Sequence, residues 1–523
     1  MDQNLPLRLP IKLLPGERLV SIEKSPAITP VSPPSFSLSD ITALQQLAGG
    51  SQLPGPMLAA LPSPEHIGDP EHELYEVLFG RDSLRVALDV MPFRPALARK
   101  ILIELARLQG STTYVRREEE NGKIVHEDRD SNDPVARKLT EERGWEWPYY
   151  GSVDATPEFV RTIAAYCQTT PEGFDLLNQT FVNKDGHEQT MLTALESAIS
   201  WIAKRLDANP EGLLEHHPAF PGSMENQVWR DSWDSFFHKN GDLANSNQGI
   251  AALDVQRVTM DALLDAADIF KHVSQQTDQI TKLRTRAEKL RQIILDRFWV
   301  DKAGGYFVLG TDRDDQGKLR PLEIQTSDMG HVLHSRLLVG DQPEIVRRKQ
   351  ALIRNLFSPH MLSINGIRTL SDQEIRFRPG AYHNGSVWAW DNYLIAQGLQ
   401  KHGYYYLGAL IDNLLINGVT ATNRFPEYWR GDPDDAVPHQ LNTQRVVVWD
   451  GKLGHENIVE QPPQDIQAWT VAAIFAIKSY NGNDGTQRHM LKPPTPFEQE
   501  ILNNITQRSD YWRRKTAAIL PVI

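Results

Sequence analysis

Apolar residues recur at three- and four-residue steps along most of the chain, which is the spacing of amphipathic helices. Between Leu84 and Leu108, Pro92 and Pro95 divide this pattern into two helices. The same spacing predicts further helices at Pro157 to Tyr166, Met191 to Leu206, Ile250 to Val273, Thr281 to Phe298, Glu344 to Leu356, Val387 to Lys401, Tyr404 to Asn417 and Ile466 to Tyr480. Strand patterns are confined to Gly122 to Val125, Tyr306 to Leu309 and Arg445 to Trp449. Many helices joined by long loops predict an all-α toroid.

The pattern changes at both ends of the chain. Residues 1–65 are rich in proline and serine, as in S-P-A-I-T-P-V-S-P-P-S, and we interpret them as an N-terminal arm. Residues 66–490 carry the helical pattern and the predicted catalytic domain, and residues 491–523 form a predicted C-terminal helical extension.

Charge and composition narrow the classes of partner. The net charge of −12 argues against nucleic acid or an anionic membrane, so a neutral carbohydrate fits better. Cys167 is the single cysteine, which excludes intramolecular disulfides, and its helical surroundings predict a core residue. The first residues lack the basic start and apolar run of a signal peptide, and no apolar run is long enough to span a membrane. We therefore expect a cytoplasmic protein, and we predict no oligomeric state.

The stretch Glu225 to Ser235 reads E-N-Q-V-W-R-D-S-W-D-S and combines acids with aromatic side chains. Asp231 and Asp234 alternate with Trp229 and Trp233. Indole faces stack on the apolar faces of sugars while carboxylates accept bonds from their hydroxyls, so the stretch suits a sugar-binding cleft. The alternative is a helix N-terminus with acidic caps.

Other loops carry the same combination of polar and aromatic residues, where a helical scaffold would present a site. They are F-G-R-D-S-L at Phe79 to Leu84, W-E-W-P-Y-Y-G-S-V-D-A-T-P at Trp145 to Pro157, R-F-R-P-G-A-Y-H-N-G-S-V-W-A-W-D-N at Arg376 to Asn392, R-F-P-E-Y-W-R-G-D-P-D-D at Arg424 to Asp435, and Q-D-I-Q-A-W at Gln464 to Trp469. Glu427 is set among aromatic residues, an environment that shifts a pKa or positions a water. Capping, core packing and solvent exposure are the competing interpretations.

Several of these stretches, in the same order, resemble the amylo-α-1,6-glucosidase family, the glucosidase part of glycogen debranching enzymes. This family is related to mannosylglycerate and glucosylglycerate hydrolases and other six-hairpin glycosidases. The resemblance covers residues 70–480 and rests on F-G-R-D-S-L, G-K-I-V-H-E, Y-Y-G-S-V-D-A-T-P, N-Q-V-W-R-D-S, G-I-R-T-L-S, Y-H-N-G-S-V-W, R-F-P-E and Q-A-W.

The resemblance implies an (α/α)6 toroid of six helical hairpins and an inverting glycoside hydrolase of the exo-acting type. By motif, Asp231 in W-R-D-S matches the general acid and Glu427 in R-F-P-E matches the general base. The resemblance also implies substrate contacts from Arg81, Asp82, Tyr150, Asp154 and Gln256, and further lining from Trp229, Trp233, His383, Asn384, Trp388 and Trp469. We expect Arg230 to point away from Asp231, so that burial between Trp229 and Trp233 raises the pKa of that acid.

This sequence departs from the family pattern near both proposed catalytic residues. Val228 replaces a usual glycine, and Tyr428 with Trp429 adds bulk after Glu427. Both changes favour a short α-linked oligosaccharide or a glucosylated solute over branched glycogen. The substrate classes left open are a dextrin-type α-glucoside and a glucosylglycerate- or mannosylglycerate-type solute. A non-catalytic carbohydrate-binding protein is the third alternative.

The sequence favours neither a metal ion nor a cofactor. Asp432, Asp434 and Asp435 sit beside a proline in a loop typical of solvated acids, and His216 with His217 lacks a third ligand at usable spacing.

Overall fold

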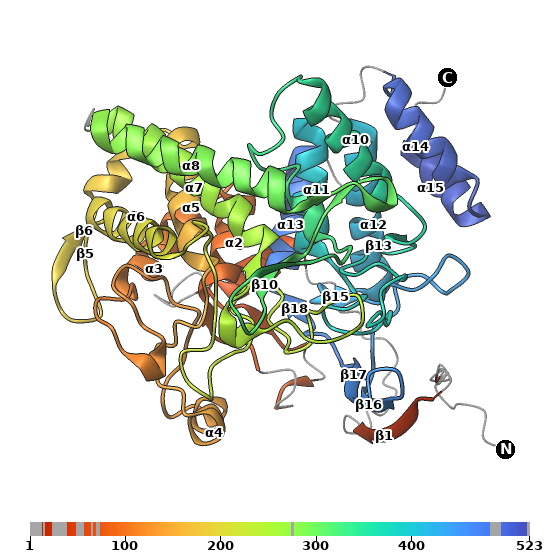
Figure 1. Ribbon diagram of the computed structural model, residues 1–523, viewed down its shortest axis with the longest axis horizontal. Helices are drawn as coiled ribbons and strands as arrows, with labels where there is room; N and C mark the ends of the chain where they lie inside the picture. The colour runs from red at the N-terminus through yellow and green to blue at the C-terminus, as the bar shows by residue number, and fades with distance from the viewer. Residues whose placement is uncertain are drawn as a thin grey trace.

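The computed structural model describes residues 13, 16–23, 39–48, 57–63, 66–68, 74–273, 277–481 and 493–519. Helices dominate, and Figure 1 shows them filling the body of the molecule. Their bounds are α1 Asp40–Leu47, α2 Gly80–Val90, α3 Pro95–Arg107, α4 Pro134–Arg143, α5 Ala155–Thr169, α6 Met191–Ala208, α7 Leu253–Val273, α8 Thr277–Arg297, α9 Asp328–His331, α10 Pro343–Leu356, α11 Ala389–Lys401, α12 Tyr405–Thr422, α13 Ala468–Asn481, α14 Pro496–Thr506 and α15 Asp510–Ile519.

The strands are short and lie between the helices. Their bounds are β1 Arg18–Glu23, β2 Ala60–Leu61, β3 Leu78–Phe79, β4 Glu127–Asp128, β5 Thr180–Val182, β6 Glu188–Thr190, β7 Ala251–Ala252, β8 Trp299–Val300, β9 Tyr306–Phe307, β10 Gly310–Arg313, β11 Leu319–Leu322, β12 Leu362–Ser363, β13 Gly366–Ile367, β14 Val387–Trp388, β15 Tyr428–Trp429, β16 Arg445–Asp450, β17 His455–Glu460 and β18 Ile466–Gln467. Antiparallel sheets join β1, β16 and β17 in that order and β11, β10 and β7 in that order. The other sheets are two-stranded.

The inner helices close into a ring. In the described chain α2 packs on α5, α5 on α7, α7 on α9, α9 on α11 and α11 on α13, which returns to α2. Their facing sides are almost entirely buried and form one continuous apolar core. A closed ring brings residues from opposite ends of the chain to one central site.

Each inner helix carries one outer helix. The outer partners are α3 on α2, α6 on α5, α8 on α7, α10 on α9, α12 on α11 and α1 on α13. The last pair joins distant parts of the chain, because α1 comes from the segment predicted as an arm. Ala43 and Leu47 of α1 are fully buried, so this piece belongs to the packed outer layer. The Pro/Ser-rich stretch at residues 25–35 lies outside the described residues.

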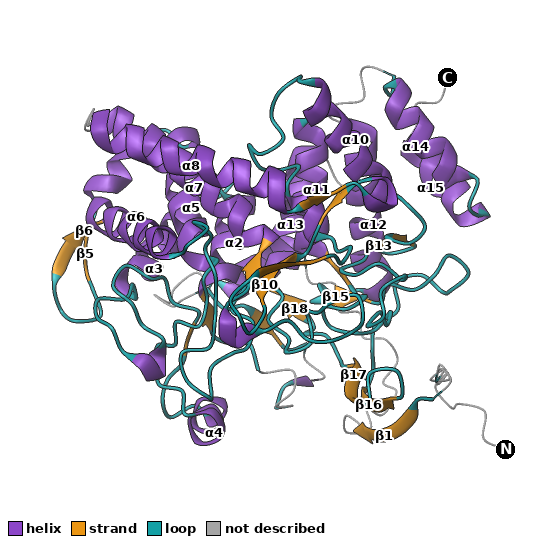
Figure 2. Ribbon diagram, viewed as in Figure 1, coloured by secondary structure: helices purple, strands orange, loops and turns teal. Residues whose placement is uncertain are grey.

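Loops and short strands collect at one end of the helical body, as Figure 2 shows below the helices. Several inner helices begin directly after a two-residue strand, such as β3 before α2, β14 before α11 and β18 before α13. The strand pair β14 and β15 aligns Trp388 with Tyr428 and so holds the Glu427 loop against the start of α11. Hence, the N-terminal ends of these helices and the long loops face each other.

The predicted helices are confirmed, and Pro95 stands in the first turn of α3 as expected for a helix start. The strand predicted at Gly122 to Val125 is wrong, because the sheet pairing begins only at Glu127. Gly122 has a φ of 88°, and the Ile124 N–H bonds the Thr156 hydroxyl in place of a strand partner. The strand predicted at Tyr306 to Leu309 is confirmed only over β9, because Val308 and Leu309 lie between β9 and β10. The strand predicted from Arg445 is confirmed by β16. No helix in the described residues is both long and apolar enough to cross a membrane.

Candidate active site

Two adjoining cavities lie where the N-terminal ends of the inner helices meet the loops. An inner chamber of about 30 Å³ is lined by Tyr75, Phe79, Arg81, Asp82, Trp229, Asp231, Tyr382, His383, Trp388, Glu427, Gln467 and Trp469. An outer cavity of about 370 Å³ shares Tyr75, Phe79, Asp231, Tyr382 and His383 with the chamber. The chamber has room for about one water molecule, so a sugar ring enters it only if side chains of the shared wall move.

Asp231 is held by an irregular loop and not by a helix, so the helix-cap interpretation of Glu225 to Ser235 is wrong. The loop is fixed by long-range contacts, because the Trp229 indole N–H donates to Asp328 at 2.7 Å and Arg230 donates to the carbonyl oxygen of His383 at 2.6 Å. Arg230 therefore points away from Asp231, as predicted. The side chain of Asp231 is one-quarter exposed, at the boundary between the two cavities.

Arg81, at the start of α2, is the cation that contacts Asp231. One terminal guanidinium nitrogen donates to Asp231 Oδ2 at 3.1 Å, and the other donates to Asp154 Oδ2 at 3.3 Å. The Arg81 Nε atom lies 3.7 Å from Asp82 Oδ2. One guanidinium therefore faces three carboxyl groups. Burial raises the pKa of Asp231 to about 6, with Arg81 opposing the shift, and raises the pKa of Asp82 to about 7.

Glu427 lies inside the inner chamber and is almost fully buried. Tyr382 donates its hydroxyl to Oε1 at 2.5 Å, and the Gln464 N–H donates to Oε2 at 3.2 Å. Burial raises the pKa of Glu427 to about 8, the two hydrogen bonds oppose that shift, and the charges of Asp82 and Asp231 add to it. Both carboxyl oxygens accept hydrogen bonds, which is the geometry of a carboxylate.

Aromatic side chains form much of the inner wall. Trp229, Trp388 and Trp469 line the chamber, and the rings of Trp388 and Trp469 have centroids 5.5 Å apart. The indole N–H of Trp469 has no hydrogen-bond partner. The wall therefore offers both ring faces and a free donor.

The outer cavity holds three more of the predicted residues, Trp233, His383 and Asn384. His383 Nδ1 lies 2.9 Å from the Ser232 hydroxyl oxygen, while its Nε2 has no partner. Asn384 donates to Asp234 Oδ2 at 3.0 Å. Asp234 also lines the outer cavity, and the structure thus separates it from Asp231, which reaches both cavities.

Two of the predicted binding residues lie away from both cavities. The Tyr150 hydroxyl donates to the Leu108 carbonyl oxygen at 2.6 Å, and the ring lies in the core. The Gln256 amide donates to the Leu214 carbonyl oxygen and accepts from the Leu214 N–H, each at 2.9 Å. Their polar groups are used inside the protein. Asp154 reaches the site only through Arg81 and lines a smaller void that adjoins the chamber.

Sequence reasoning missed Tyr75, Phe79, Tyr382 and Gln467 as chamber residues, although Phe79 opens the motif F-G-R-D-S-L. Tyr382 and Gln467 stand inside the motifs Y-H-N-G-S-V-W and Q-A-W, so their position beside His383 and Trp469 was the available signal. Gln467 Nε2 donates to Asp82 Oδ1 at 3.4 Å. No sequence pattern marks Tyr75, which reaches the chamber from the segment before α2.

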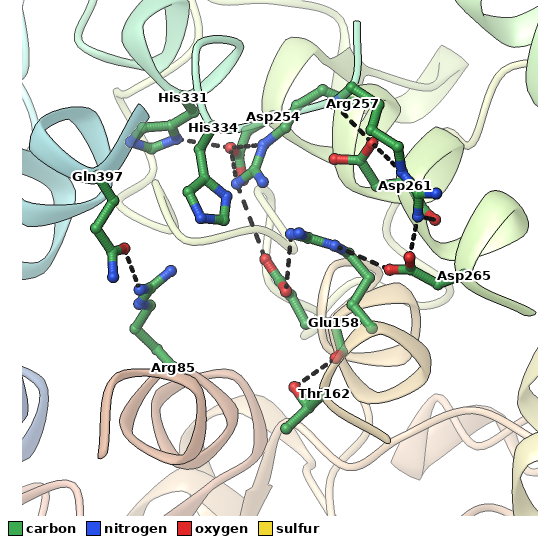
Figure 3. Close-up of polar contacts among 12 residues, drawn as sticks. Arg85, Glu158, Thr162, Asp254, Arg257, Asp261, Asp265, His331, His334 and Gln397 are labelled. Atoms are coloured by element: carbon green, nitrogen blue, oxygen red, sulfur yellow. Dashed lines mark hydrogen bonds and ion pairs between the residues drawn. The ribbon is translucent and has the colours of Figure 1, made fainter. Parts of the chain in front are cut away.

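A separate network of buried ionic groups adjoins the chamber, because Asp254 lines a small void together with the chamber residues Trp229 and Trp469. Figure 3 shows part of this network. His331 of α9 contacts Asp254 of α7 through Nδ1 at 2.6 Å and Asp391 of α11 through Nε2 at 2.5 Å. Arg257 donates to the same Asp254 oxygen at 2.6 Å. Burial lowers the pKa of His331, but the carboxylates of Asp254 and Asp391 outweigh it and raise the pKa to about 9. Asp254 is the larger contributor. The network ties three inner helices together.

Comparison with known proteins gives the class of this architecture. A family model described as "Mannosylglycerate hydrolase MGH1-like glycoside hydrolase domain" matches residues 99–474. No curated protein sequence matches the chain.

Solved structures share the fold at low sequence identity. The GH63 mannosylglycerate hydrolase from Thermus thermophilus in complex with Tris has 15% identity and a TM-score of 0.55, over 84% of this chain and 98% of that one. The same enzyme with Tris and D-glycerate gives 14% identity and a TM-score of 0.53, and with glucose 15% and 0.54, each over 84% of this chain and 98% of that one.

The fold is therefore the six-hairpin (α/α)6 toroid, as predicted, and the class is that of glycoside hydrolases. The chain belongs to the MGH1-like glycoside hydrolase family. The resemblance to six-hairpin glycosidases is confirmed at this level. The finer assignment to amylo-α-1,6-glucosidases has no support from the comparisons, which point to the related mannosylglycerate hydrolases.

Proposed function

We propose that the protein is an inverting, exo-acting glycoside hydrolase in which Asp231 is the general acid and Glu427 the general base. The observation that carries this proposal is the arrangement of the two carboxyl groups around one chamber. Asp231 stands where the chamber meets the outer cavity, and Glu427 stands inside the chamber. A sugar in the chamber then has its glycosidic oxygen beside Asp231, with the leaving group in the outer cavity.

The reaction divides its two proton transfers between these groups. Asp231 gives a proton to the glycosidic oxygen as the bond from C1 to that oxygen breaks, while Glu427 takes a proton from a water whose oxygen bonds to C1. Because the water attacks from the side opposite the leaving group, the anomeric configuration inverts. Inverting enzymes hold the two carboxyl groups roughly 6.5 to 9.5 Å apart to leave room for the water.

The protonation states of the chamber follow from its charges. Asp82, Asp231 and Glu427 share it with Arg81, so their protons are coupled and the apparent pKa values belong to the group. The two donors to Glu427 favour its carboxylate form. Asp231 accepts from Arg81 through Oδ2, which leaves Oδ1 to carry the transferred proton.

Two substrate classes follow from the family and the site. The first is a short oligosaccharide with a terminal α-linked glucose. The second is a mannosylglycerate- or glucosylglycerate-type solute, supported by the family description. Tyr428 and Trp429 are fully buried and line neither cavity, so their bulk does not decide between these classes, contrary to the expectation from the sequence.

A substrate panel followed by proton NMR tests the proposal. We expect hydrolysis of one or more of isomaltose, maltose, limit dextrin, trehalose, glucosylglycerate and mannosylglycerate, with the β-anomer appearing first from an α-linked substrate. Initial release of the α-anomer would contradict inversion. The α-glucosyl and α-mannosyl fluorides serve as controls, because fluoride leaves without any contact in the outer cavity.

A further inference from the structure

We propose that the outer cavity receives an uncharged, polyhydroxylated leaving group, a polyol or a second sugar, and discriminates against one that carries a carboxylate. This inference rests on the proposed function, because it assigns the leaving-group side of the same site. It selects between the two proposed substrate classes, and it disfavours the glycerate-bearing solutes that the family description names.

Acidic side chains outnumber cations on the cavity wall. Among the described residues, the acids that line it are Glu127, Glu225, Asp231 and Asp234. Asp82 and Glu427 lie just behind Asp231 in the inner chamber. Asp231 is protonated when it acts as the general acid, so the negative charges that a leaving-group carboxylate would meet are those of Asp234 on the cavity wall and Glu427 behind Asp231. Like charges near one another in a partly buried site disfavour binding.

The two arginines on the described cavity wall already have partners. Arg129 is buried, and its guanidinium donates to Glu127 and to the Leu74 carbonyl oxygen. Arg143 lies at the rim, about 4.0 Å from Glu225 and with its guanidinium 5.8 Å from the centre of the Trp145 ring. A substrate carboxylate would have to compete with an acid for either arginine.

The unused hydrogen-bonding groups of the cavity are neutral. His126 and His383 are buried, and each has one ring nitrogen without a partner in the structure. Burial, with the charge of Arg81 or Arg230 nearby, lowers the pKa of both imidazoles well below the ordinary value, so they are uncharged. A neutral imidazole bonds a hydroxyl without requiring a charge on the ligand.

Aromatic rings complete the match to an uncharged sugar or polyol. Trp145, Trp233 and Tyr382 line the same cavity as the two histidines. One face of Trp145 is covered by Tyr149, whose ring centre lies 3.9 Å away. Trp233 is only partly buried, which leaves ring surface for a sugar face. Ring faces and neutral nitrogens together recognise hydroxylated carbon skeletons.

The test compares substrates that differ only in the charge of the leaving group. For both glucose and mannose, kcat/KM is measured on the α-glycoside of glycerol and on that of D-glycerate, with an α-linked disaccharide as a third arm. For whichever of glucose and mannose gives the higher kcat/KM, we expect kcat/KM on the glycerol glycoside to be at least ten times that on the glycerate glycoside. The disaccharide arm separates a polyol site from a sugar site. Equal rates, or a preference for glycerate, would overturn the inference.

The glycosyl fluorides separate the two possible failures. Hydrolysis of a fluoride together with a preference for glycerate refutes the leaving-group inference and leaves the proposed reaction standing. Absence of fluoride hydrolysis refutes the proposed reaction and the inference with it.

Two variants of the rim locate the cause of the preference. Glu225→Gln removes one acid, so the ratio of kcat/KM on the glycerate glycoside to that on the glycerol glycoside should rise several-fold. Arg143→Gln should change this ratio less than twofold. A selective loss of glycerate activity in Arg143→Gln would show that the rim arginine captures a carboxylate, and this result would overturn the inference.

Discussion

Two groups of buried acids lie at the same end of the helical ring, and they differ in how their charges are compensated. In the chamber, Asp82 and Asp231 contact one guanidinium, that of Arg81, while Glu427 accepts hydrogen bonds from uncharged donors. Burial raises the pKa values of all three groups. In the adjoining network, Asp254 contacts both His331 and Arg257. These cations outweigh the effect of burial and lower the pKa of Asp254.

This difference separates a group that we propose to react from a group that we propose to hold the fold together. A carboxyl group exchanges protons near neutral pH only if its charged form is poorly compensated, and the chamber meets that condition. A fully paired carboxylate is locked in one state and fixes its neighbours. Burial alone therefore does not distinguish Asp254 from the chamber acids, whereas its two contacting cations do. Asp391, for which His331 is the one contacting cation among the described residues, keeps a pKa raised by burial.

The largest expected effect comes from removing the chamber carboxyls. Asp231→Asn and Glu427→Gln should each lower kcat by about a thousandfold, the usual scale for a lost general acid or base. Because each variant removes a poorly compensated buried charge, thermal unfolding should occur at an unchanged or higher temperature. The measurements are steady-state kinetics and calorimetry on the same samples.

Two controls sharpen the assignment of roles. On a glycosyl fluoride, Asp231→Asn should lose much less activity than on an O-glycoside, because fluoride needs little protonation. Glu427→Gln should lose activity on both. Near-normal activity in Asp231→Asn combined with inactivity in Asp234→Asn would show that the acid is Asp234.

A substitution in the His331 network should lower the free energy of unfolding. His331→Gln leaves Asp254 and Asp391 without their shared cation, and breaking a buried ion pair of this kind costs on the order of 3 kcal/mol of unfolding free energy. Urea unfolding of the variant and the unaltered protein at pH 6 measures the loss. An unchanged midpoint would contradict the proposed role of the network.

The same histidine predicts a pH dependence of stability. Its pKa is about 9 in the folded protein, above the ordinary unfolded value of about 6.5. The folded state therefore binds more protons between these values, and the His331 contribution is full below about pH 6.5 and is lost as pH rises through 9. The stability difference between the unaltered protein and His331→Gln should shrink over that window. A constant difference would show that the imidazole is uncharged.

The chamber should produce a bell-shaped pH profile of kcat/KM. Raised pKa values of about 6 for Asp231 and about 8 for Glu427 place the limbs near those pH values. Below the lower limb both groups are protonated, and above the upper limb both are ionised, so the rate falls about tenfold per pH unit on either side. Between the limbs the pair shares one proton, and these pKa values place it mostly on Glu427, so the reactive form with the proton on Asp231 is the minor one. A lower limb near pH 4 would mean that the chamber acids are as well compensated as Asp254.

The smallest effects are expected from the two predicted binding residues that lie away from the cavities. Tyr150→Phe removes the donor to the Leu108 carbonyl oxygen and should cost about 1 kcal/mol of stability. Its KM and kcat on the best substrate should stay within twofold of the unaltered protein. A KM raised tenfold or more would place Tyr150 back in the binding site.

The helices were predictable because their pattern is local. The apolar spacing within α7, α12 or α13 is written in consecutive residues, and Pro95 marks a helix start through its own backbone geometry. The strand predicted at Gly122 was misplaced, because a side chain from the start of α5 satisfies the Ile124 N–H. Such short strands form only where a partner strand pairs with them, and the local sequence pattern does not show where that partner lies.

The candidate site also contains residues that the sequence placed correctly and residues that it did not. The motifs around Asp231 and Glu427 identified both carboxyls as candidates by resemblance, and the structure places both on one chamber. Tyr150 stands in an equally suggestive stretch and Gln256 was predicted by the family resemblance, yet their polar groups bond the Leu108 and Leu214 backbone. A residue type in a motif indicates what chemistry is available, and the direction of the side chain decides whether it is used.

By itself the sequence predicted a mainly helical toroid, which the structure confirms, and it also predicted a neutral carbohydrate as the partner and the two acids proposed to act on it. Only the tertiary structure decided that Arg81, 150 positions from Asp231, is the cation beside that acid, and that His331 compensates a different set of acids. The physical reason is that a pKa depends on burial and on charges within a few ångströms, and closure of the helical ring alone brings those charges together.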